Sequence, residues 1–125
     1  KIDIQFNSEI SVAYVNADKE QLLRVLNNLV NNAIQSIEDN KRGEIKLRLL
    51  KEKDFYIVSV ADNGIGIHER VKQKIFQPNF STKSYGTGLG LAMCKRIIEH
   101  HNGAIWFESE TNSGTTFYFK LQSIG

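Results

Sequence analysis

The sequence predicts an α+β fold, a two-layer α/β sandwich in which a mixed, mainly antiparallel sheet is covered on one face by about three helices. Short strand-like stretches come in pairs, and segments with the helical apolar period separate the pairs. Hairpins separated by helices are typical of this layered architecture. A chain of 125 residues with 41% hydrophobic content suffices for one core, so we expect a single domain over residues 1–125.

The first element expected is a strand pair at the N-terminus. Residues 2–6 and 10–15 are apolar stretches, and the polar dipeptide Asn7-Ser8 lies between them. Apolar stretches that flank a short polar connection predict a β-hairpin.

A long helix is expected from Asp18 to about Asp39. Asp18 is a candidate N-cap, and Gln21 three residues later completes a capping box. One arc of the helical wheel is apolar and contains Leu22, Leu26, Leu29, Ala33 and Ile37. The opposite arc is polar and contains Gln21, Arg24, Asn28, Asn32 and Gln35. We expect the apolar arc to face the core.

The middle of the chain predicts a second hairpin and a short helix. Residues 40–43 suit a turn between that helix and the alternating stretch 45–49, which pairs with the apolar stretch 55–61. Residues 69–76 suit a short helix. Residues 77–86 follow neither period and predict a loop or lid.

The last third predicts a helix and two closing strands. The helix covers residues 88–101, because Asn102-Gly103 is a good C-terminal stop. The closing strands are expected at residues 105–108 and 115–121.

Charge and composition argue against several classes. The net charge of +2, with no long cluster of Lys and Arg, disfavours nucleic acid as a partner. No apolar run approaches the roughly 18 to 20 residues that cross a bilayer. Cys94 is the single cysteine, so it forms no intramolecular disulfide. We expect a cytoplasmic domain, alone or as the cytoplasmic part of a membrane-anchored protein.

Two glycine clusters are the most informative feature of the chain. Residues 62–67 are Asp-Asn-Gly-Ile-Gly-Ile, and residues 85–91 are Tyr-Gly-Thr-Gly-Leu-Gly-Leu. The second cluster matches neither the Rossmann nor the P-loop spacing. It opens into a helix, however, and the bare N–H groups and positive end of a helix suit a phosphate. The two clusters are expected to form opposite ends of one nucleotide pocket, with ATP as the ligand.

Several side chains near these clusters are candidates for chemistry. Asn28 and Asn32 are neighbours at i and i+4, and their amide oxygens suit Mg²⁺, unless they only cap or face solvent. Asp62 closes an apolar strand and can accept a hydrogen bond from an exocyclic amine, or it can serve a turn. Surface or structural roles are expected for His68, His100, His101 and Cys94.

The segment between the clusters combines aromatic and phosphate-binding residue types. These are Phe76, Pro78, Phe80, Ser81, Thr82 and Lys83. The aromatics suit anchors for a loop whose hydroxyls and ammonium group reach phosphate. The alternative is a plain connection.

Taken in order, these motifs resemble the ATP-binding catalytic domain of sensor histidine kinases, within the superfamily that includes gyrase, Hsp90 and MutL. Residues 26–33 are similar to the N box, 62–66 to the first glycine box, 75–80 to the F box and 86–91 to the second glycine box. Residues 114–117 match the end of the family pattern. The resemblance covers nearly the whole chain, implies the Bergerat fold, and is nearest in pattern to nitrogen-regulation and sporulation kinases with a short lid.

The resemblance implies a role for each matching residue. Asn32 would ligate Mg²⁺, and Asn28 would lie close to the phosphates as the catalytic residue. Asp62 would bind the adenine amino group, with Thr115 helping through water. The other implied nucleotide contacts are Gln35, Gly64, Gly66, Ile67, Phe80, Lys83, Gly86, Thr87, Gly88, Leu89, Gly90 and Leu91.

Two positions depart from the family pattern. Hydrolytic members carry Glu four residues before the metal Asn, where this chain has Asn28, and an amide cannot take a proton from water. Steady ATP hydrolysis is therefore disfavoured. Many sensor kinases carry Lys or Arg three residues after the metal Asn, where this chain has Gln35. Arg24 and Lys83 are the candidates to replace that cation.

The implied reaction is transfer of the ATP γ-phosphoryl group to a histidine. No His-Glu dipeptide within a helical hairpin occurs in this sequence, so the phosphoacceptor is expected on a dimerisation domain of a longer parent protein, with a response regulator as the next partner. We expect this fragment to be monomeric and its parent homodimeric. The alternatives are a degenerate nucleotide-binding module without transfer activity, and an anti-sigma-type serine kinase or ATPase of the same superfamily.

Overall fold

The computed structural model describes residues 1–8, 10, 13–77 and 90–124. The strands are β1 (Ile2–Ser8), β2 (Gly43–Glu52), β3 (Phe55–Asp62), β4 (Ala104–Glu110) and β5 (Gly114–Gln122). The helices are α1 (Lys19–Ser36), the 3-10 helix η1 (Glu69–Lys74) and α2 (Gly90–His100). None of the helices in these residues is long and apolar enough to span a bilayer.

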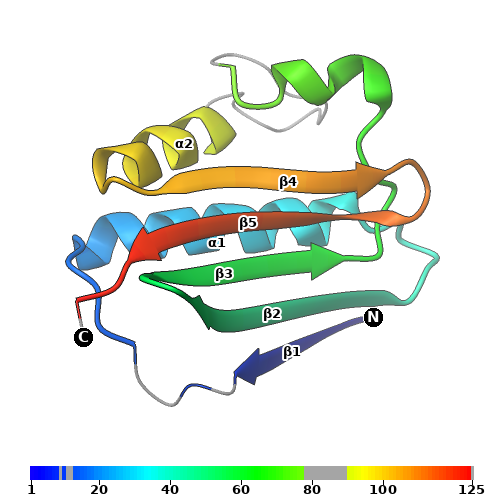
Figure 1. Ribbon diagram of the computed structural model, residues 1–125. Coiled ribbons are helices and arrows are strands. Elements are labelled where there is room, and N and C mark those ends of the chain that lie inside the picture. Colours follow the sequence, from blue (N-terminus) through cyan, green and yellow to red (C-terminus); the bar gives the residue numbers. More distant parts are fainter. Residues whose placement is uncertain (9, 11–12, 78–89, 125) are drawn as a thin grey trace.

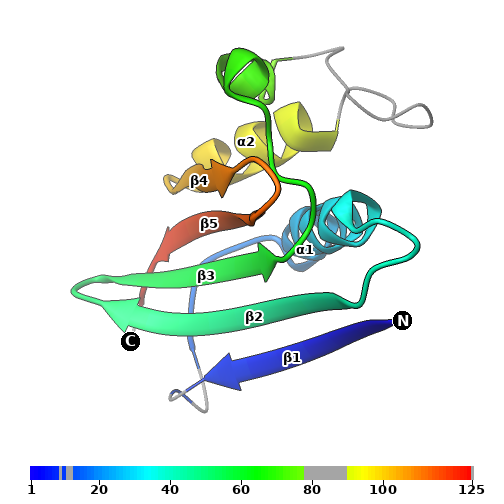
Figure 2. The same ribbon diagram turned by 90° about the vertical axis from the view of Figure 1, so that its right-hand side faces the viewer.

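The strands form one sheet in the order β1-β2-β3-β5-β4 (Figure 1). β1 runs parallel to β2, and the remaining neighbours are antiparallel. α1 and α2 lie on the same face of this sheet (Figure 2). The predicted two-layer fold with a mixed, mainly antiparallel sheet is therefore confirmed.

The core lies between the two α-helices and the helix-facing side chains of the sheet. The buried apolar residues of the helices are Val25, Leu29, Ala33, Ala92, Cys94, Ile97 and Ile98, and those of the strands are Ile45, Tyr56, Val60, Phe117, Phe119 and Leu121. Leu22 and Leu26, from the predicted apolar arc, pack against this core but are only partly buried. Phe76 follows η1 and sets its ring edge-on to Phe107 and Phe117, with ring centroids 5.9 and 6.2 Å apart.

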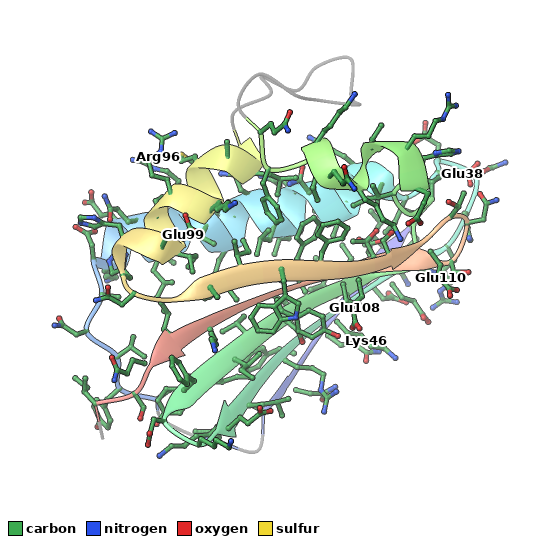
Figure 3. All side chains as sticks on the ribbon, turned by 45° about the horizontal axis from the view of Figure 1, so that its top comes forward. Glu38, Lys46, Arg96, Glu99, Glu108 and Glu110 are labelled. Atoms are coloured by element: carbon green, nitrogen blue, oxygen red, sulfur yellow. The ribbon has the colours of Figure 1, made fainter. Side chains whose placement is uncertain are left out.

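The opposite face of the sheet carries polar and aromatic side chains. Lys46 and Glu108 lie in one row across the strands on this face (Figure 3). The rings of Trp106 and Tyr118 stack there with centroids 5.3 Å apart. Glu108 accepts a 2.8 Å hydrogen bond from the Tyr118 hydroxyl, which raises the pKa of Tyr118. Polar side chains on one face and buried apolar side chains on the other are expected of an antiparallel sheet with one solvated face.

The predicted N-terminal hairpin is wrong. Asn7 and Ser8, expected in its turn, are the last residues of β1, and every residue of β1 pairs with β2. In the second apolar stretch, Val15 makes an isolated bridge with Ser123, and residues 11 and 12 lie outside the described residues. The backbone N–H and C=O groups of β1 find hydrogen-bond partners on the edge of β2. No second strand from residues 10–15 is required to pair with β1.

The other boundaries agree with the sequence to within a few residues. Asp18 caps α1 as predicted, because its Oδ1 accepts a 3.1 Å hydrogen bond from the Gln21 N–H. The reciprocal half of the predicted capping box is wrong, because the Asp18 N–H donates to His101 and not to the Gln21 side chain. α1 ends at Ser36 rather than near Asp39, because Ile37 is extended and its side chain is buried in the core. The predicted helix over 69–76 is the shorter η1, and α2 is described from Gly90 onward.

Cys94 is a core residue, as predicted. Its side chain is fully buried, and its Sγ lies 3.9 Å from the Val25 carbonyl oxygen. Burial raises the pKa of the Cys94 thiol to about 12. The reactive thiolate is therefore scarce at neutral pH in the folded domain.

We expect the Cys94 thiol to resist thiol–disulfide exchange at pH 8 in the native domain and to exchange rapidly in denaturant. A disulfide reagent that reports released thiolate measures both rates, and the single cysteine makes the signal unambiguous. Equal rates in the folded and unfolded chain would contradict the described burial.

His101 links the end of α2 to the start of α1. Its Nε2 lies 3.1 Å from the Asp18 N–H, and its Nδ1 lies 2.8 Å from the Ile97 carbonyl oxygen. A backbone N–H can only donate, so Nε2 accepts and Nδ1 carries the proton. The ring thus has a structural role, and the residue to which it binds is also the N-cap of α1.

Replacing His101 by alanine should lower the free energy of unfolding by about 1 to 2 kcal/mol, because both ring hydrogen bonds are lost. His100→Ala is the matched control, since His100 is exposed on the same turn. Urea denaturation measures both variants. Equal stabilities of the two variants would show that the ring contacts contribute nothing.

Candidate functional site

Three polar side chains share one row at the end of the sheet, on the helix-facing side. Asp62 of β3 pairs with Thr115 of β5, and Thr115 pairs with Ser109 of β4. Paired residues of an antiparallel sheet point to the same face. The register therefore brings a carboxylate and two hydroxyls together where β3 ends.

The Asp62 carboxylate is held by backbone donors. Its Oδ1 accepts hydrogen bonds from the Gly64 N–H at 2.9 Å and the Thr115 N–H at 3.3 Å. The bond to Gly64 is the turn contact that the sequence offered as an alternative for Asp62. The turn fixes the direction of the carboxylate and so is compatible with a role in binding.

The glycines after Asp62 allow close approach to two other segments. A Cβ on Gly64 would lie 2.6 Å from the Ser36 carbonyl oxygen at the end of α1. Gly66 has φ +76° and lies against the Glu110 carbonyl. The Ile65 N–H donates to the Ser36 carbonyl at 3.0 Å. The loop after β3 is thus tied to α1 on one side and to the β4–β5 hairpin on the other.

The far end of this loop reaches β4. The Ile67 N–H donates to the Ser109 Oγ at 2.8 Å. The Lys72 Nζ of η1 donates to the Ser109 carbonyl at 2.7 Å and pairs with Glu69 at 3.0 Å. Ser36, Lys72 and Ser109 were all missed by the sequence analysis. The three residues lie far from the glycine loop or outside its motif in the sequence, and tertiary contacts bring them beside it.

A second group of predicted residues meets where α1 passes the start of α2. Asn28 is half-buried, and its Oδ1 lies 2.5 Å from the position that a Cβ on Gly90 would occupy. The Asn28 Nδ2 donates to the Arg24 carbonyl at 3.0 Å, so its amide is oriented with the oxygen toward Gly90. Asn32 is half-buried one turn further along α1. Asn28, a candidate for the predicted Mg²⁺ and phosphate site, is therefore adjacent to Gly90, the first described residue of α2.

The first part of α2, described from Gly90 onward, is compatible with a negatively charged ligand. Its first turn contains no acidic residue. Gly90 and Leu91 are partly buried there, and Leu91 packs against the core. The dipole of a helix favours a negative ligand near its N-terminal end.

The remaining predicted residues are Arg24, Gln35 and a set outside the described part of the chain. Arg24 and Gln35 are exposed on α1. Outside the described residues lie Pro78, Phe80, Ser81, Thr82, Lys83, Gly86, Thr87, Gly88 and Leu89. Their roles, like those of the described site residues, stay predictions.

The mixed five-stranded sheet with α1 and α2 on one face is the fold expected of an ATP-binding domain of the Bergerat type. The chain belongs to the family described as histidine kinase-, DNA gyrase B-, and HSP90-like ATPase, whose model matches residues 17–124. The family resemblance inferred from the motifs is therefore confirmed.

Sensor kinases are prominent among the similar proteins. The phytochrome-like protein Cph1 of Synechocystis sp. is 43% identical over 115 residues, covering 89% of this chain and 15% of that protein. The signal transduction histidine-protein kinase AtoS of Escherichia coli is 42% identical over 117 residues, covering 91% and 19%. The chain thus spans less than a fifth of these two relatives.

Solved structures agree with the fold. The catalytic domain of histidine kinase ThkA superposes with a TM-score of 0.85 at 42% identity, covering 97% of this chain and 78% of that one. A structure of ThkA in complex with response regulator protein TrrA matches with a TM-score of 0.80 at 37% identity, covering 97% and 34%.

Two glycine substitutions should separate folding from site geometry. Gly64→Ala places a methyl group against the rigid Ser36 backbone and should cost about 1 to 3 kcal/mol of stability. Among the described residues, a methyl group at Gly90 meets the tip of the Asn28 side chain, so in Gly90→Ala the fold should be retained while that side chain rotates. Urea denaturation and the NMR signals of the Asn28 side-chain amide report the two effects. Unmoved Asn28 signals in Gly90→Ala would contradict the described contact.

Proposed function

We propose that this domain binds Mg²⁺-ATP and transfers the γ-phosphoryl group to a histidine on the dimerisation domain of its parent protein. The observation that carries the proposal is the pairing of two groups: the backbone-held Asp62 at the end of the sheet, and Asn28 against the start of α2. One group suits a nucleobase and the other suits phosphates. α1 extends between them and contributes to both.

At the base end, Asp62 accepts a hydrogen bond from the adenine 6-amino group. Two N–H donors already orient the carboxylate, so little ordering remains to be done on binding. Thr115 is 5% exposed and acts through a water. Gly64 and Gly66 carry no side chain, so a flat ring can approach the backbone of the loop closely. Guanine presents an acceptor at the position of the amino group and is rejected.

At the phosphate end, the N-terminus of α2 and the Asn28 and Asn32 amides face the triphosphate. Neutral amide oxygens are hard donors, so Asn32 fits as a ligand of Mg²⁺ and Asn28 as a neighbour of the phosphates. Mg²⁺ held there would neutralise phosphate charge and help to align the transferring group. Lys83 and Arg24 remain the candidates for the cation that Gln35 does not supply.

The proposed reaction breaks the bond between the ATP γ-phosphorus and its bridging oxygen and forms a phosphorus–nitrogen bond to the histidine. ADP leaves, and the residues of this chain act by position and charge. Asn28 does not activate a water molecule, because an amide is no general base. Transfer to an aligned imidazole is therefore favoured over hydrolysis.

The partners of the domain follow from the same proposal. ThkA, which shares the fold, was crystallised with a response regulator. We propose a response regulator as the next acceptor here as well, a homodimeric parent with a monomeric catalytic fragment, and a cytoplasmic location.

The test combines calorimetry and transfer. The domain is titrated with ATP, ADP and GTP, with and without Mg²⁺, and then incubated with radiolabelled ATP and the dimerisation domain of its parent. Adenine-selective binding strengthened by Mg²⁺, followed by acid-labile label on the dimerisation domain, supports the proposal. Binding without transfer would indicate a degenerate module, and rapid release of phosphate to water would indicate an ATPase.

Asp62→Asn should weaken ATP binding by about 1 to 3 kcal/mol, because it removes a charge-assisted hydrogen bond. The substitution keeps an oxygen that can accept from the Gly64 N–H, so the turn should survive. Asp54→Asn, at an exposed position in the β2–β3 turn, is the matched control. Calorimetric titration measures both, and normal ATP affinity in Asp62→Asn would remove Asp62 from the site.

A further inference from the structure

Ser109 is the meeting point of three segments beside the proposed base pocket. Its Oγ accepts the Ile67 N–H at 2.8 Å and lies 2.7 Å from the Thr115 Oγ1. It also donates to the Gly114 carbonyl at 3.1 Å. The residue is half-buried on β4 and belongs to none of the family boxes.

The hydrogen count couples Ser109 to Thr115. The Ser109 hydroxyl has one proton, and the Ile67 N–H occupies one of its lone pairs. When Ser109 donates to the Gly114 carbonyl, the Thr115 hydroxyl donates to Ser109 and turns its lone pairs elsewhere. When Ser109 donates to Thr115 instead, the Thr115 proton is released toward another acceptor. Thr115 is 5% exposed, so bulk water does not readily replace this partner.

The same serine holds the loop that follows Asp62. The loop is fixed at its start by the Gly64 N–H on the Asp62 Oδ1 and at its end by the Ile67 N–H on Ser109. The Thr115 N–H donates to the Asp62 Oδ1 at 3.3 Å, so Asp62, Thr115 and Ser109 belong to one hydrogen-bond network. Loss of the Ser109 hydroxyl would therefore release the loop end and the Thr115 hydroxyl together.

We propose that Ser109 is a positioning residue for recognition of the purine 6-amino group. It does not touch the nucleotide and acts by fixing the loop after Asp62 and by holding the Thr115 hydroxyl in a hydrogen bond. This inference rests on the proposed function, because it assumes that Asp62 binds the adenine amino group. It adds a determinant of base specificity on a strand outside the motifs.

The experiment measures the coupling between Ser109 and the amino group. ATP and purine riboside triphosphate, which lacks only the 6-amino group, are titrated by competition calorimetry into the wild-type domain, Ser109→Ala and Ser113→Ala. Ser113 is an exposed serine of the same hairpin and serves as the control. Urea denaturation shows that each variant is folded under the conditions used. Ser109→Cys, which keeps the side-chain shape but offers only a weak hydrogen-bonding thiol, replaces the alanine variant if that variant does not fold.

In the wild type, removal of the amino group is expected to weaken binding about tenfold or more. In Ser109→Ala, ATP should bind about five- to tenfold more weakly while the purine analogue changes less than twofold, so the preference for ATP shrinks. Ser113→Ala should behave like the wild type. An equal loss for both nucleotides, or no loss for either, would overturn the positioning role. A wild-type domain that binds ATP no better than the analogue would instead overturn the proposed adenine site.

Discussion

The shared register of β3, β5 and β4 is the constraint on which the site depends. It places Asp62, Thr115 and Ser109 in one row on the helix-facing side. A slip of one residue in either pairing would turn a member of that row to the opposite face. The buried apolar residues further along the same strands, Val60 and Phe117 among them, resist such a slip, because it would expose them. The hydrophobic core thus sets the polar geometry at the end of the sheet.

α1 carries the second constraint, because it reaches both halves of the site. Asn28 in its middle lies against the start of α2, and Ser36 at its end lies against Gly64. The buried face of α1, with Val25, Leu29 and Ala33, fixes its position on the sheet. The separation between the two halves of the proposed site, at Gly64 and at Gly90, is therefore set by rigid packing.

Local signals predicted the parts of the structure that depend on local physics. The Asp18 cap, the second hairpin and the two closing strands follow from side-chain chemistry and period, and the glycine clusters with Asn28 pointed to the correct family. The N-terminal hairpin was wrong because an apolar stretch does not reveal which strand it will pair with, and β1 found β2. Ser109 was missed because the predicted closing strand ended at residue 108. β4 continues to Glu110, and the alternation of side chains along the strand puts Ser109 on the same face as Phe107, where it pairs with Thr115.

The stacked pair Trp106 and Tyr118 gives the domain an optical property of practical use. Trp106 is the single tryptophan of the chain, and it lies on the sheet face turned away from the helices and the Asp62 row. Its fluorescence therefore reports whether the sheet is intact, while remaining insensitive to what occupies the opposite face. An emission change on adding a ligand would signal rearrangement of the sheet itself.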